Sequence, residues 1–93
     1  MQGVFIPQIM FKVANKGLVV SGSLKSGVLK LGMILEIDKI SVPLLGLEAL
    51  NKKIEEIKGG EEFAGQLGII LQEIAEKVIA KNINQEIIFK ETN

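Results

Sequence analysis

Four glycines recur at five-residue intervals, at Gly17, Gly22, Gly27 and Gly32. The residues between them alternate between apolar and polar, which is the pattern of a strand with one buried face. Glycine weakens a strand interior, so a regular series of glycines indicates turns, bulges or close backbone approaches in a small curled sheet. A phosphate-binding glycine loop would need a helix directly after the glycines, and no helical pattern follows. The series therefore predicts a fold rather than a catalytic site.

Short apolar segments separated by glycine-containing turns continue along the chain. We expect strands at 4–14, 18–25, 33–38, 40–50, 66–72 and 85–90, turns at 15–17 and 26–27, a short segment at 28–31, and one or two helical turns within 73–81. In the first strand, Phe5, Ile9, Phe11 and Val13 share one face. Pro7 cannot donate to a ladder, so this strand should start late or lie at an edge. We predict an all-β fold, a six- to seven-stranded closed or nearly closed antiparallel barrel, in one domain over residues 1–93.

Two segments allow alternative interpretations. The apolar residues of 47–58 fit an amphipathic helix that ends at Gly59-Gly60, but the same letters also fit a hairpin with a turn at Asn51-Lys52, which we favour. Phe63 lies in a loop, where it can plug the core or serve as a stacking platform; we favour the plug. The last residues, Thr92 and Asn93, are expected to fray.

Composition removes most catalytic chemistry. The chain has no cysteine, histidine or arginine, and its eleven lysines balance eleven acidic residues. Catalytic triads built on histidine or cysteine, disulfides and the usual zinc sites are therefore excluded. We expect no metal and no cofactor. No apolar run reaches the ~20 residues of a membrane span, and the N-terminus lacks the pattern of a signal peptide, so we expect a cytoplasmic protein without a membrane contact.

The glycine series and two later segments resemble one known family. The run GLVVSGSLKSGVLKLGMILEI over residues 17–37, LEALNKKIEEIKGG over 47–60 and AGQLGIIL over 64–71 are similar, in this order, to domain II of the translational GTPases. That domain is the barrel that follows the nucleotide-binding domain in elongation factor Tu, the selenocysteine-specific elongation factor and bacterial initiation factor two. The resemblance covers about residues 4–72 and implies the same barrel.

The resemblance also implies where a ligand would bind. In the tRNA-carrying members this barrel holds the terminal aminoacyl-adenosine in a shallow pocket, and the matching positions are Leu24, Glu48 and Leu71. The position three residues after the carboxylate, often basic in the family, is Asn51. No GxxxxGK[ST] motif is present, so we expect no binding of a nucleoside triphosphate. The resemblance therefore implies a stand-alone, non-catalytic binding module whose partner is RNA, a tRNA end, the ribosome or a translation protein.

Charged and apolar surface residues leave two further interpretations open. The lysines of the first two hairpins can contact a nucleic-acid backbone, or can simply keep exposed strands soluble; they are Lys12, Lys16, Lys25 and Lys30. The paired acids of 55–56 and 61–62 fit a solvated surface better than a metal site. The alternative function is a protein interaction or assembly module, unrelated to RNA, that forms a homo-oligomer or docks on a partner through the barrel edge.

Overall fold

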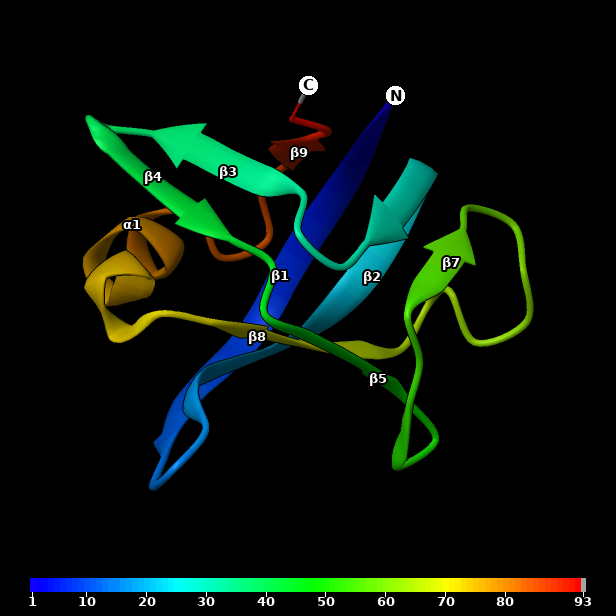
Figure 1. Cartoon of the computed structure of the whole chain (residues 1–93), viewed down its shortest axis with the longest axis horizontal. Helices are drawn as coiled ribbons and strands as arrows, with labels where there is room; N and C mark the ends of the chain where they lie inside the picture. Colours follow the sequence, from blue (N-terminus) through cyan, green and yellow to red (C-terminus); the bar gives the residue numbers. More distant parts are fainter. Residues whose placement is uncertain (93) are drawn as a thin grey trace.

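The computed structural model describes residues 1–92, and antiparallel strands dominate it (Figure 1). Its elements are β1 (Gln2–Val13), β2 (Gly17–Lys30), β3 (Ile34–Ile37), β4 (Ile40–Pro43), β5 (Gly46–Ala49), β6 (Lys52–Lys53), β7 (Glu56–Lys58), β8 (Leu67–Leu71), η1 (Glu73–Ala75), α1 (Glu76–Lys81) and β9 (Ile87–Lys90). The all-β fold with two short helical turns is confirmed. The described residues form nine strands rather than six or seven, because the segments around Pro43 and Ile54 each divide in two.

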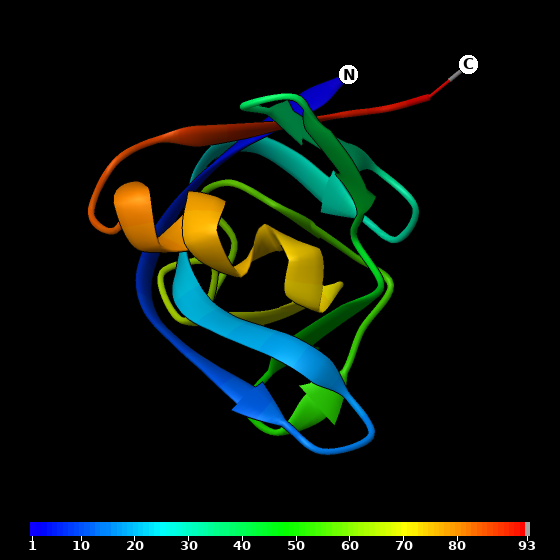
Figure 2. The same cartoon turned by 90° about the vertical axis from the view of Figure 1, so that its left-hand side faces the viewer.

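The strands form one curled sheet in the order β4-β3-β9-β1-β2-β8-β5-β6, with β7 paired to β2 outside this path. The two residues that connect β4 to β5 bond to the segment before β3 on one side and to β8 on the other. The amide of Leu44 donates to the carbonyl of Met33, and the amide of Leu45 donates to the carbonyl of Ile70. Figure 2 shows η1 and α1 lying across the open side of the curl. The sheet is therefore an open, curled half-barrel with a helical cover.

A β-bulge in β1 changes which side chains point inward. Pro7 pairs with Gly22 and Ile9 pairs with Ser21, so Gln8 is an extra residue without an opposite partner. An extra residue exchanges the two faces of everything that follows it. Phe5 is fully buried before the bulge, whereas Ile9 is 63% exposed after it. The expectation that Phe5, Ile9, Phe11 and Val13 share one face is therefore wrong.

The environment of Pro7 differs from the expectation for the first strand. β1 starts early, at Gln2, and has neighbours on both sides, β2 and β9. The ladder with β9 covers Gln2–Phe5 and ends two residues before Pro7. A residue without an N–H is tolerated here because no β9 ladder passes it. β1 as a whole is thus an inner strand with a local edge at its proline.

β2 runs through the predicted turn at Ser26-Gly27 as one strand of 14 residues. Gly27 has a φ of 79° and follows a second register shift, at which Lys25 is the extra residue. After Gly27 the strand leaves the β1–β8 sheet and pairs with β7 through Val28–Lys30. The positive φ therefore serves a bulge at which one strand passes from one partner to another, rather than a reversal of the chain.

The segment 47–58 is a hairpin, as favoured from the sequence. Glu48 pairs with Lys53 and Ala49 with Lys52, which leaves Leu50 and Asn51 as a two-residue loop. Both loop residues have positive φ, 52° and 62°, which is the geometry of a type I′ turn. The turn lies one residue earlier than expected.

The core is aliphatic with two aromatic side chains at its centre. Phe5 and Phe89 meet edge to face, with ring centroids 6.5 Å apart. Among the described residues, every buried side chain of the core is apolar. Phe63 is not a core plug, because 41% of it is exposed at a φ of 71° in the 59–66 loop. In residues 1–92 no helix is long and apolar enough to cross a membrane. The expectation for Asn93 lies outside the described residues.

Candidate functional site

One row of paired residues crosses the outer face of four neighbouring strands. Ile9 of β1 pairs with Ser21 of β2, Ser21 pairs with Gly68 of β8, and Gly68 pairs with Glu48 of β5. Residues paired directly across an antiparallel sheet point to the same face. A continuous surface therefore runs from an apolar side chain, over a hydroxyl and a glycine, to a carboxylate.

This surface is hollowed into a groove of about 630 Å³. Its main lining comes from β1 with Ile9 and Phe11, β2 with Val19 and Ser21, β8 with Gly68, β5 with Glu48, and the turns with Lys16, Leu50 and Asn51. We call this surface the groove. Gly68 forms part of its floor, and a Cβ placed there would meet only the Cβ of Glu48, at 3.9 Å. The absence of a side chain at Gly68 therefore keeps the floor flat, and the backbone at Gly68 does not itself require glycine.

The β1 end of the groove is apolar and open to solvent. Ile9 is 63% exposed and Phe11 is 50% exposed, although both lie in a strand. The bulge at Gln8 is the cause, because without an extra residue these side chains would share the inward face with Phe5. Bulges commonly re-aim side chains next to functional sites. The groove thus has an exposed apolar wall that the fold of β1 creates locally.

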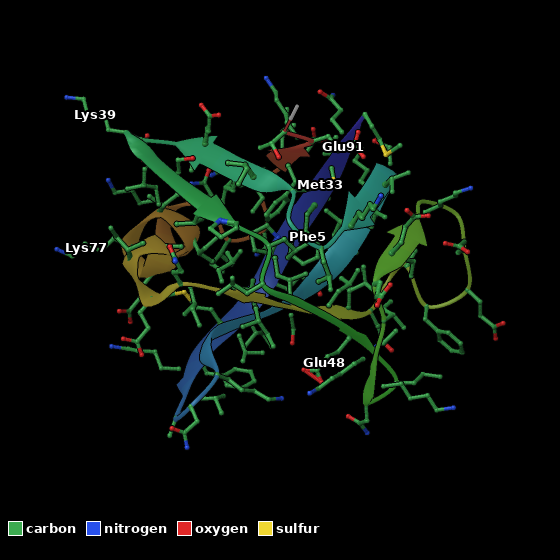
Figure 3. The ribbon with its side chains drawn as sticks, in the orientation of Figure 1. Phe5, Met33, Lys39, Glu48, Lys77 and Glu91 are labelled. Carbon is green, nitrogen blue, oxygen red and sulfur yellow. The ribbon has the colours of Figure 1, made fainter. Side chains whose placement is uncertain are left out.

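The charged residues of the groove form an ion pair. The Nζ of Lys16, in the turn between β1 and β2, lies 3.2 Å from Oε1 of Glu48. The Glu48 side chain is 24% exposed and the Lys16 side chain is 44% exposed. Figure 3 shows Glu48 below β5, on the outer side of the sheet and away from the core residue Phe5. Both charges are therefore accessible to a ligand that enters the groove.

The three residues matched to an adenosine pocket do not lie together on the surface. Leu24 is 4% exposed and Leu71 is fully buried, and both belong to the same apolar core. Only Glu48 lines the groove. The two leucines lie on β2 and β8, the strands whose outer faces carry Ser21 and Gly68. Both leucines therefore belong to the core and not to the groove.

The four lysines of the first two hairpins are also separated by the fold. Lys12 pairs with Glu76 of α1 at 3.2 Å, and Lys25 pairs with Glu86 before β9. Lys16 lines the groove, whereas Lys30 lies at the opposite end of β2. These lysines do not form one continuous basic patch. Acidic residues from the second half of the chain pair with three of them and partly neutralise their charge.

The paired acids lie on exposed surface. All four are exposed, namely Glu55, Glu56, Glu61 and Glu62. The carboxylate of Glu61 accepts a hydrogen bond from the backbone amide of Lys58. No group of three histidine, cysteine or acidic residues within 1–92 is arranged to hold a metal ion. Glu61 thus supports the turn after β7, and the other three acids lie on exposed surface.

Comparison with solved structures finds the same fold in a translation factor. Translation elongation factor SelB from Methanococcus maripaludis, in its apo form, matches with a TM-score of 0.68 and 21% identity. The match covers 98% of this chain and 19% of that chain. The chain therefore spans about a fifth of the length of that protein, and at this identity the likeness shows the fold alone. No family model matches. The resemblance to a translation-factor barrel that the glycine series indicated is confirmed at the level of the fold.

Proposed function

We propose that this chain is a non-catalytic binding module of the translation-factor type, which holds an unpaired RNA end in the groove. The observation that carries the proposal is the arrangement around Gly68, where an apolar wall, a flat floor and the Lys16–Glu48 pair meet on one face. Recognition of RNA relies on unstacked bases at loops and ends, which stack on aromatic side chains and offer their polar edges. The likeness of the fold to a translation factor also supports a role in binding RNA.

Each part of an RNA end finds a suitable group in the groove. An unstacked base has an apolar face that packs on Phe11 and Ile9. The Glu48 carboxylate accepts hydrogen bonds from ribose hydroxyls, and the Lys16 ammonium attracts a phosphate. Gly68 lets the ligand approach the backbone of β8 closely. The chain has no histidine or cysteine, and the charges of the groove suit hydrogen bonds to hydroxyls and attraction of a phosphate, so the proposed role is binding.

This proposal assigns the predicted residues different tasks. Glu48 and Lys16 contact the ligand, whereas Leu24 and Leu71 support the strands from the core side. Of the four predicted lysines only Lys16 lines the groove, so the contact with the RNA backbone falls to Lys16.

The exposed apolar side chains also favour a second function, a protein interaction module. Ile9, Phe11 and Leu50 are each at least half exposed and line the same groove. Apolar side chains gathered on one face are typical of a surface that another protein covers. In that case light scattering would show a dimer or a complex, and variants of Phe11 would disperse it.

The two functions are separated by an NMR titration of the isotopically labelled chain with the RNA trinucleotide CCA. We expect shifts of the backbone amides of Lys16, Ser21, Glu48 and Gly68. The control ligand is CCA with a phosphate on its 3′-oxygen, which places a negative charge beside Glu48 and should bind more weakly. No saturable shifts at millimolar trinucleotide, or shifts spread evenly over the lysines, would contradict the RNA proposal.

A further inference from the structure

Two hairpins of this chain use the same two-residue turn with different residues. The β3–β4 hairpin turns at Asp38 and Lys39, with φ values of 49° and 69°. The β5–β6 hairpin turns at Leu50 and Asn51, with φ values of 52° and 62°. Type I′ turns favour asparagine, aspartate and glycine, whose short or absent side chains tolerate positive φ. Asp38 and Asn51 fit this preference, whereas Lys39 and Leu50 do not, and of these two only Leu50 is apolar and lines the groove.

In the free protein, packing of the Leu50 side chain does not offset the energetic cost of its positive φ. Leu50 is 59% exposed, although Ala49 and Ile54 of the same segment pack against the core. A branched apolar side chain at positive φ is unfavourable, and exposure to water adds no stabilising burial. Local backbone outliers of this kind cluster at binding sites. The second observation that places Leu50 in a site is its position on the rim of the groove, beside Glu48.

We propose that Leu50 is a specificity-determining contact, which the turn holds out so that it packs on a nucleobase of the bound RNA end. This inference rests on the proposed function. The strand order puts β1 and β5 on opposite sides of β2 and β8, so Leu50 extends the apolar lining to the side opposite Ile9 and Phe11. The groove then has one apolar contact at its β1 end and a second one beside Glu48 at its β5 end. Such a lining selects a ligand by its flat apolar faces as well as by its phosphate.

The test combines a change in the protein with a change in the ligand. The probes are CCA and the same trinucleotide whose last residue lacks its base. For the native chain we expect removal of the base to weaken binding about tenfold, because a base contact worth ~1.4 kcal/mol corresponds to a tenfold difference in affinity. For Leu50→Asn we expect this ratio to fall to about threefold or less, because part of the base contact is lost while the turn becomes more favourable. Leu50→Met keeps an apolar side chain of similar size and should retain the native ratio.

The matched control is Lys39→Gly in the other type I′ turn, which Figure 3 shows far from Glu48. We expect Lys39→Gly and Leu50→Asn both to leave the midpoint of urea unfolding unchanged or higher, whereas only Leu50→Asn weakens CCA binding. If Leu50→Asn binds CCA as tightly as the native chain, the inference is wrong and the RNA function stands. If the native chain itself does not bind CCA, both are overturned.

Discussion

The Nζ of Lys16 lies 3.2 Å from Oε1 of Glu48, and the two residues are 32 positions apart in the chain. Their pairing connects the β1–β2 turn to β5 at the polar part of the groove. Both side chains retain contact with water, so solvent and salt screen their attraction. Such a pair separates readily when a ligand offers a phosphate to the lysine and hydroxyl groups to the carboxylate.

The first prediction concerns this pair and folding stability. Because both side chains are partly exposed, Lys16→Met, Glu48→Gln and the double variant should each change the free energy of unfolding by about 1 kcal/mol or less. Urea unfolding of the three variants measures these changes and gives the coupling between the two residues. A coupling of several kcal/mol would show that the pair supports the fold rather than the groove.

A second prediction uses the salt dependence of RNA binding. If Lys16 contacts a phosphate, Lys16→Met should reduce the slope of log affinity against log salt concentration by about 0.7, the contribution of one contact to a single strand. The measurement is fluorescence anisotropy with labelled CCA-ended RNA at several salt concentrations. Lys30→Met, at the opposite end of β2, is the matched control and should leave the slope unchanged. An equal reduction in both variants would mean that the charge acts without a defined site.

The floor of the groove provides a third prediction. Gly68→Val should abolish RNA binding, because its side chain fills the space between Ser21 and Glu48. The strand itself should accept the change, since the new Cβ makes only an ordinary contact at 3.9 Å and valine favours strands. Thermal unfolding should therefore show a melting temperature that is equal or higher.

The control for the floor is Gly65→Val. Gly65 lies outside the groove, and nothing stands within 4 Å of a Cβ placed there. Its RNA affinity should equal that of the native chain. Retained binding by Gly68→Val would contradict the location of the site.

A fourth prediction concerns Gly22 and the fold. A Cβ at Gly22 would collide with the carbonyl oxygen of Ile6 and would lie 2.7 Å from Cζ of Phe5. Backbone and a buried ring cannot move aside cheaply, so Gly22→Ala should lower the free energy of unfolding by about 3 kcal/mol. Gly65→Ala should change it by about 0.5 kcal/mol or less. Equal stability of the two variants in urea would show that β1 and β2 are not packed this closely.

Local signals in the sequence predict much of this fold. Asn15 and Gly17 have positive φ in a tight turn, as expected of these residue types, and the buried face with Leu18, Val20 and Leu24 follows from simple alternation. The sequence also favours the hairpin over 47–58, which the strand pairing confirms. These features depend on residues close together in the chain, so a single sequence contains their cause.

Features that depend on the register between paired strands cannot be predicted from the pattern of one sequence. Pro7, Ile9 and Phe11 continue the alternation of Phe5, and nothing in the letters shows that Gln8 is an extra residue. The bulge is set by the partner strand, and it moves the apolar wall of the groove from the inside to the outside. Similarly, Gly27 lies within a strand because β2 changes partners there. Glu48 could be proposed from resemblance, whereas Ile9, Phe11 and Leu50 could not.

The place of β9 in the sheet determines the order in which the fold can be completed. β9 is the last strand in sequence, yet it lies between β1 and β3, two strands made much earlier. The β1–β2 hairpin is local and can close as soon as its residues are synthesised, but β3 and β4 have no place in the main sheet until residues 87–90 arrive. A growing chain therefore keeps these edges of β1 and β3 unpaired until residues 87–90 are made, and loss of Phe89 would leave them open to other chains.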